Sequence, residues 1–165
     1  MLRRRSWPRS SRRRDLKAYR GHCRCGEVQL EVQGPPLLTA ACHCEGCQRM
    51  TAGAFSLNAL YREENFRLIA GETVLGGLKG PTRHFFCPSC LSWLFTKPDG
   101  LDGMVNIRTP MLERAQDFPP FAEFYGDEGI PGAKTGAPRH FANAPSADEF
   151  FGLTKEYASW QGRPG

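Results

Sequence analysis

Short stretches in which apolar and polar residues alternate recur along the chain. The stretch Glu27-Val-Gln-Leu-Glu-Val-Gln33 places Val28, Leu30 and Val32 on one face, which is typical of a half-buried β-strand. Further short strands are predicted over residues 54–61, 66–69, 73–78, 82–86, 92–96, 104–108 and 121–125. Glycine and proline separate these runs and indicate turns, as at Pro98-Asp99-Gly100.

Helical patterns are scarce by comparison. A short helix is predicted over residues 45–51, and one or two helical turns over residues 147–151. The pattern therefore predicts a mainly β protein, built as folded β-sheets of short strands with little helix.

The 165 residues fit one domain with tails. We expect a disordered arginine-rich arm over residues 1–18 and the main domain over residues 19–125. Residues 126–165 form a Gly/Pro-rich C-terminal extension that packs on the domain or trails from it.

The net charge of +5 arises from the arm, because residues 1–14 carry seven arginines and no acidic residue. We favour a disordered tail, with an electrostatic arm for nucleic acid or another polyanion as the alternative. Arg12-Arg13 resembles a twin-arginine export signal, but polar residues follow where such a signal needs an apolar stretch. No run of residues is apolar enough to span a membrane, and we expect a cytoplasmic protein.

Seven cysteines in such a chain favour metal binding over disulfides. They fall into three groups, which are Cys23-x-Cys25, Cys42-x-Cys44-x-x-Cys47 and Cys87-x-x-Cys90. The two pairs together offer four thiolates, which is the number that a closed structural zinc site needs. The remaining three leave one tetrahedral position for water or substrate, as catalytic zinc sites do.

Two alternatives stay open. Cys87-Pro-Ser-Cys90 could be a redox motif, although the flanking residues are strand-like rather than helical. The group of three could be a second closed zinc site if His43, His84 or His140 supplied the fourth ligand.

These groups also carry a resemblance. Gly21-x-Cys-x-Cys-Gly26, Cys42-His-Cys-x-x-Cys-Gln-Arg49 and Phe86-Cys-x-x-Cys90 resemble, in this order, the glutathione-dependent formaldehyde-activating enzyme family, which also includes centromere protein V-like members. The similarity covers about residues 19–110. It implies an Mss4-like β fold with two zinc ions per chain, on the same four and three cysteines. The family usually has glycine after the last pair, where this chain has Leu91, so a different turn or modest strain is expected there.

The resemblance also implies a substrate chemistry. A zinc ion on three soft thiolates is a weak Lewis acid but a good binder of another thiol, and the thiolate form is the nucleophile. The expected activity is a carbon–sulfur lyase that forms or cleaves an S-hydroxyalkyl adduct, with glutathione as the thiol and formaldehyde as the aldehyde by resemblance.

Substrate residues are predicted from charge. Glutathione carries two carboxylates, so Arg49 and then Arg108 are the expected substrate-binding residues. His43 or His84 could transfer a proton, but a structural role is favoured for both. The aromatic residues Phe55, Phe85, Phe86 and Trp93 are interpreted as core.

A competing hypothesis is a zinc-stabilised binding module whose arginine-rich arm contacts nucleic acid or an acidic partner. We regard nucleic acid as the less favoured partner. A homo-oligomer is compatible with the sequence, which contains no signal for one.

Overall fold

The structure is a computed structural model that describes residues 16–78 and 80–165. The predicted arm over residues 1–18 therefore lies outside the described residues except for its last three. The strands are β1 (Ala18–His22), β2 (Gln29–Gln33), β3 (Leu38–Cys42), β4 (Ser56–Arg62), β5 (Phe66–Ala70), β6 (Val74–Gly76), β7 (Arg83–Phe86), β8 (Trp93–Lys97), β9 (Met104–Arg108), β10 (Ala122–Phe124) and β11 (Arg139–His140). The helices are α1 (Glu45–Thr51) and α2 (Ala147–Ser159), with short 3-10 turns between strands.

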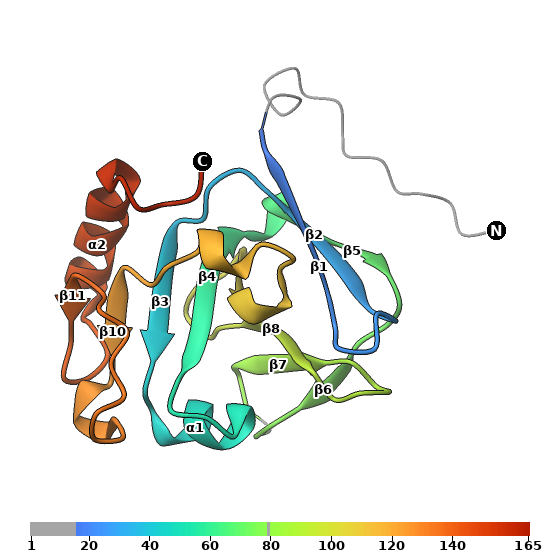
Figure 1. Ribbon diagram of the computed structural model, residues 1–165, viewed down its shortest axis with the longest axis horizontal. Coiled ribbons are helices and arrows are strands. Elements are labelled where there is room, and N and C mark those ends of the chain that lie inside the picture. Colours follow the sequence, from blue (N-terminus) through green and yellow to red (C-terminus); the bar gives the residue numbers. More distant parts are fainter. Residues whose placement is uncertain (1–15, 79) are drawn as a thin grey trace.

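The strands form two sheets. A three-stranded antiparallel sheet has the order β1-β2-β5, and an eight-stranded sheet has the order β11-β10-β3-β4-β9-β8-β7-β6. The larger sheet is antiparallel except at β10, which runs parallel to both β3 and β11. Figure 1 shows β1, β2 and β5 on one side of the molecule and α2 with β10 and β11 on the opposite side. The predicted mainly β fold with little helix is confirmed.

The alternation of side chains gives the larger sheet two different faces. One face packs against the smaller sheet and forms the main core, which includes Val28, Leu30, Val32, Ala59, Tyr61, Leu94, Phe95, Val105 and Ile107. Val28, Leu30 and Val32 are fully buried, as their alternation predicted. The opposite face of the larger sheet carries Leu38, Ala40 and Cys42 on β3 and Asn58 and Leu60 on β4, and it points toward the C-terminal region.

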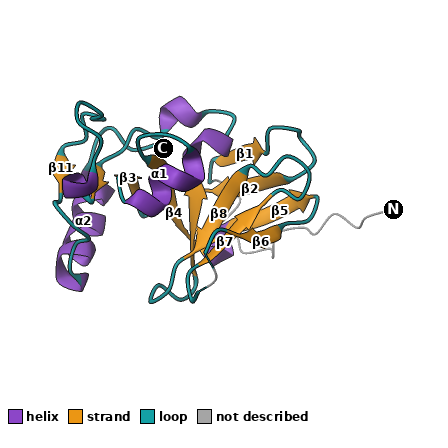
Figure 2. Ribbon diagram, turned by 90° about the horizontal axis from the view of Figure 1, so that it is seen from below, coloured by secondary structure: helices purple, strands orange, loops and turns teal. Residues whose placement is uncertain are grey.

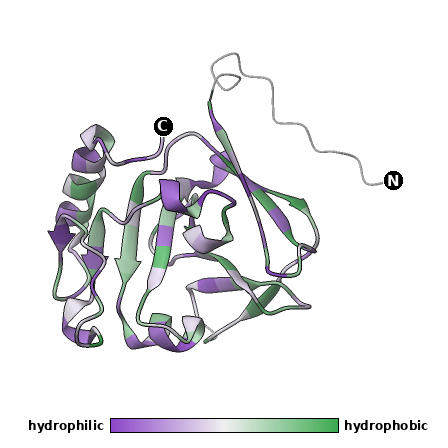
Figure 3. Cartoon of the chain, viewed as in Figure 1, coloured by the Kyte–Doolittle hydropathy of each residue, from purple (hydrophilic) through white to green (hydrophobic). Residues whose placement is uncertain are grey.

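The C-terminal residues cover part of that second face. Leu153 and Tyr157 of α2 are buried with Leu38, Leu60 and Phe121 in a second apolar cluster. Hydrophobic and hydrophilic residues both occur along α2 (Figure 3), as expected of a helix that packs on one side only. The chain between β10 and α2 returns to the sheet through β11.

Four elements differ from the sequence-based expectations. The strands β1, β3 and β11 were not predicted. Only Ala18, the first residue of β1, lies in the segment assigned to the arm, and β3 has buried residues on both faces rather than alternation. The helix α2 runs to Ser159 instead of ending near residue 151. Phe150, Leu153 and Tyr157 have the helical spacing that would have shown this. Figure 2 shows α2 as the longer helix, set apart from α1.

Among the described residues, neither helix has the length and apolar character required to cross a membrane.

Candidate metal centres and the adjoining cavity

Four cysteines from two distant turns meet at one point. The sulfur atoms of Cys23, Cys25, Cys87 and Cys90 all lie within 4.8 Å of one another. Cys23 and Cys25 come from the turn between β1 and β2, and Cys87 and Cys90 from the turn between β7 and β8. The cluster therefore joins the smaller sheet to the larger one.

The geometry of this cluster suits a tetrahedral metal. The Cys23 and Cys25 sulfurs are 3.4 Å apart and the Cys25 and Cys87 sulfurs 3.7 Å apart. Zinc–sulfur bonds of about 2.3 Å at tetrahedral angles put sulfurs about 3.8 Å apart. The backbone N–H of Val28 also donates to the Cys23 sulfur at 3.3 Å, as second-shell groups commonly do at metal sites. These four residues fit a closed zinc site, and a redox role for Cys87 and Cys90 would require that they be metal-free.

The remaining cysteines form a second cluster. The sulfurs of Cys42, Cys44 and Cys47 lie within 4.8 Å of one another, with Cys42 and Cys44 3.5 Å apart. Cys42 ends β3, Cys44 is the N-cap residue of α1, and Cys47 lies in the first turn of that helix. The Cys44 sulfur accepts a hydrogen bond from the Cys47 backbone N–H at 3.4 Å, which fixes the start of the helix.

The close contact of these three thiols shifts their pKa values in opposite directions. Hydrogen bonds from Cys42 and Cys47 lower the pKa of Cys44 to about 2. The hydrogen bonds that Cys42 makes with Cys44 and Cys47 raise the pKa of Cys42. Three thiolates this close repel one another unless protons or a cation lie between them. The donor set fits three of the four positions around a zinc ion.

No histidine joins the trio within the described residues. The ring of His43 is buried and its Nε2 lies 3.7 Å from Glu123 Oε1, while His140 Nδ1 lies 2.8 Å from Glu123 Oε2. His84 Nδ1 is bonded instead to Thr96 Oγ1 at 2.9 Å. The fourth position is therefore not closed by a described histidine.

Arg108 is the buried cation beside the trio. Its guanidinium donates to Asn58 Oδ1, Ser56 Oγ and Thr96 Oγ1, and it stacks on Trp93 with Cζ 3.9 Å from the ring centroid. Burial lowers the pKa of Arg108 to about 10, against the opposing effect of the three cysteine sulfurs. The group stays protonated at neutral pH, and its charge offsets that of the thiolates.

Arg49 lies elsewhere. It is on the exposed side of α1, where its Nη2 is 2.9 Å from Glu45 Oε2. It is not among the described residues that line the cavity beside the trio. A role of Arg49 in substrate binding stays a prediction.

Thr96 determines the tautomer of His84. Its Oγ1 accepts N–H bonds from Trp93 Nε1 at 3.2 Å and from Arg108 at 3.1 Å. Since both lone pairs are used, the Thr96 hydroxyl proton points to His84 Nδ1. His84 is then neutral with its proton on Nε2, and burial together with Arg108 lowers its pKa.

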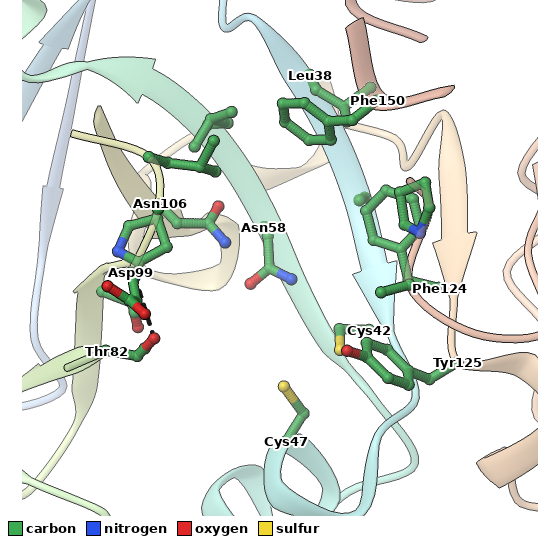
Figure 4. Close-up of a pocket in the computed structure, with 18 of the residues that line it drawn as sticks. Leu38, Cys42, Cys47, Asn58, Thr82, Asp99, Asn106, Phe124, Tyr125 and Phe150 are labelled. Atoms are coloured by element: carbon green, nitrogen blue, oxygen red, sulfur yellow. Dashed lines mark hydrogen bonds between the residues drawn. The ribbon is translucent and has the colours of Figure 1, made fainter. Parts of the chain in front are cut away.

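A cavity of about 600 Å³ opens beside the trio on the second face of the larger sheet. Figure 4 shows Cys42 and Cys47 at one end of it, Asn58 in the middle, and Leu38 and Phe150 at the other end. Arg108 and Trp93 also line it, so Trp93 contributes to the cavity as well as to the buried interior. Of the three cysteines of the trio, Cys42 and Cys47 line this cavity.

Tyr125 is a cavity residue that no sequence signal indicated. It has a left-handed backbone with φ of 59°, and its ring lies next to Cys42 in Figure 4. Burial, and then the charges of Cys42 and Cys44, raise the pKa of its hydroxyl. Such a backbone in a non-glycine residue at a pocket is a frequent feature of functional sites.

Comparisons with known proteins agree with this geometry. Residues 18–128 match the family model described as glutathione-dependent formaldehyde-activating enzyme. A crystal structure of a Rhodobacter sphaeroides protein has a TM-score of 0.50 and 19% identity, over 74% of this chain and 99% of that one, which supports the fold alone. A search of curated proteins found no match. Since the family match covers most of the chain and both cysteine clusters, the protein belongs to the glutathione-dependent formaldehyde-activating enzyme family.

Proposed function

We propose that the protein is a zinc-dependent carbon–sulfur lyase that forms or cleaves an S-hydroxyalkyl thiol adduct. The observation that carries this proposal is the contrast between the two cysteine clusters. Four sulfurs form a set that needs no other ligand, whereas the group of three lies beside a cavity of about 600 Å³ that Cys42 and Cys47 line. Glutathione and formaldehyde are the substrates that the family description names.

Cys42, Cys44 and Cys47 would hold a zinc ion, which would supply Lewis-acid chemistry and favour the thiolate form of a thiol substrate. Arg108 offsets the excess negative charge of the three thiolates from a buried position. Asn58, Ser56 and Thr96 accept its hydrogen bonds and hold it in place. Removing this charge would leave a buried anionic centre without compensation.

The reaction needs no oxidant. A C–S bond forms between the thiol sulfur and the aldehyde carbon, and the thiol proton finally resides on the new hydroxyl group. Tyr125 lines the cavity and is protonated at neutral pH, as any tyrosine with an ordinary or raised pKa is, so its hydroxyl can donate to the aldehyde oxygen as charge develops there. In the reverse direction the C–S bond breaks, the hydroxyl oxygen loses its proton as the aldehyde forms, and the sulfur gains a proton to become the free thiol.

Replacement of one hydroxyl tests this role. We expect Tyr125→Phe to lower kcat about tenfold or more, because a donor to the developing oxyanion is lost, with little change in KM for the thiol. Tyr61→Phe is the matched control, since the Tyr61 hydroxyl is buried in the main core and makes no hydrogen bond. Equal kcat for Tyr125→Phe and Tyr61→Phe would contradict the assignment.

A panel of thiols and aldehydes, assayed on zinc-replete protein, tests the activity as a whole. The proposal requires two zinc ions per chain, measured by elemental analysis, and turnover that disappears in Cys47→Ser. Removal of residues 1–14 should leave turnover unchanged. A binding module would instead show no turnover and would lose its salt-dependent affinity with those residues.

A further inference from the structure

The cavity wall opposite the trio is built in part by residues outside the family-matched segment. The match ends at residue 128, whereas residues 144–147, Phe150 and Phe151 line the cavity. These residues form the approach to α2 and its first turns. The C-terminal extension therefore shapes the part of the pocket that a substrate meets beyond its sulfur.

This wall is strongly apolar. Phe150 and Phe151 line the cavity together with the apolar residues Leu38, Leu60, Leu101 and Phe124. Phe150 packs partly against the second apolar cluster, while 57% of Phe151 is exposed. An exposed aromatic side chain at the rim of an apolar pocket can bury further area only when a ligand covers it.

The charges of the pocket do not suit glutathione. Among the described residues that line it, Arg108 is the only lysine or arginine, and its guanidinium already bonds to Asn58, Ser56 and Thr96 beside the sulfurs. Asp99 adds a negative charge to the lining. The first turn of α2 attracts no anion either, because Glu149 and Ser146 form a capping box there. The two carboxylates of glutathione would enter without a free cationic partner.

From this wall and these charges we infer that the preferred adduct carries an uncharged apolar group, of the size of a phenyl ring or a short alkyl chain. This inference rests on the proposed function and changes its substrate class. The apolar group can come from the thiol or from the aldehyde, since the sulfur of the adduct is bonded to a carbon from each of them. The balanced reaction is R–SH + R′–CHO ⇌ R–S–CH(OH)–R′, with the apolar group as R or R′.

The first arm of the test measures binding rather than turnover. Cobalt(II) replaces zinc in the full-length protein, and the visible spectrum is titrated with 2-phenylethanethiol, 2-mercaptoethanol and glutathione. We expect 2-phenylethanethiol to bind at least about tenfold more tightly than glutathione, because its ring is buried against Phe150 and Phe151. The second arm measures turnover of zinc protein with phenylacetaldehyde or formaldehyde at fixed 2-mercaptoethanol, and a preference in this arm assigns the apolar group to the aldehyde.

Variants of one exposed residue connect the preference to the wall. Phe151→Ala should weaken binding of the apolar probe about fivefold, and Phe151→Lys should shift the preference toward glutathione. Leu75→Ala is the control, since Leu75 is 65% exposed on β6 and lies outside the cavity. Circular dichroism verifies that all three variants fold.

The outcomes separate the two proposals. Tighter binding of glutathione than of 2-phenylethanethiol in the first arm together with a preference for formaldehyde in the second, or Phe151 variants that behave like Leu75→Ala, would overturn the apolar preference and leave the lyase activity standing. No spectral change with any thiol would contradict the proposed function itself.

Discussion

Leu91 occupies a backbone conformation that glycine adopts more easily. Its φ is 56°, in the left-handed region, directly after Cys90. A different turn or modest strain was expected at this position, and the structure has a left-handed residue with an exposed side chain there. Its N–H still donates to the Cys87 carbonyl at 3.0 Å, so the turn that presents the ligands is intact.

Leu91→Gly should therefore stabilise the protein. We expect the free energy of unfolding to rise by about 1 kcal/mol, because glycine has no Cβ to clash in this conformation. The side chain is mostly exposed, so little packing is lost. Denaturant unfolding measures the change, and Leu91→Ala, which removes the side chain but keeps the Cβ, should not reproduce it.

His84 should make stability depend on pH. Its pKa is lowered in the folded protein, so the unfolded chain binds a proton more readily. The stability from neutral His84 is complete above the unfolded pKa of about 6.5 and decreases as the pH falls below it. His84→Asn keeps an acceptor for Thr96 without a titrating ring. The loss of Tm between pH 7 and pH 5 should be smaller in this variant than in the wild type, and an equal loss would exclude His84 as the cause.

At the level of elements, α2 depends on its N-terminal cap. Ser146 accepts a hydrogen bond from the Glu149 N–H, and the Glu149 carboxylate accepts one from the Ser146 N–H. Ser146→Ala should lower the free energy of unfolding by about 1 kcal/mol and speed amide hydrogen exchange in α2. Ser159→Ala at the last residue of the helix is the control. No difference between the two variants would mean that the cap does not stabilise the wall.

Local sequence patterns predict some of the elements and not others. The strand β2 and the helix α1 follow local patterns, which are alternation in the first and an N-cap with a short turn in the second. β3 escaped prediction because its first four residues are all buried, so buried and exposed side chains do not alternate along it. β11 contains only two residues and exists because β10 pairs with it.

At the scale of the whole molecule, the four-sulfur cluster connects the two sheets. Each sheet supplies one turn, so the cluster links the two sheets that enclose the main core. A structural zinc contributes roughly 10–16 kcal/mol of apparent binding free energy, much of it as folding free energy. We therefore expect Cys90→Ser to give insoluble protein. Soluble, zinc-loaded Cys90→Ser protein with the wild-type Tm would refute a structural role for this cluster.

The sequence by itself determined the grouping of the seven cysteines, because each group is confined to a turn of a few residues. The spacing within a turn is enough to bring two or three sulfurs together. Alternation likewise determined which residues of β2 face the core.

Only the tertiary structure decided what surrounds the trio. Arg108, Asn58 and Tyr125 come from β9, β4 and the residue after β10, and the wall of Phe150 and Phe151 comes from α2. Arg108 rather than Arg49 lies at the cavity because β9 presents alternate residues to that face, whereas the α1 surface carrying Arg49 points to solvent. Such neighbours depend on strand order and on how the C-terminal segment packs, and these long-range contacts leave no local pattern in the chain.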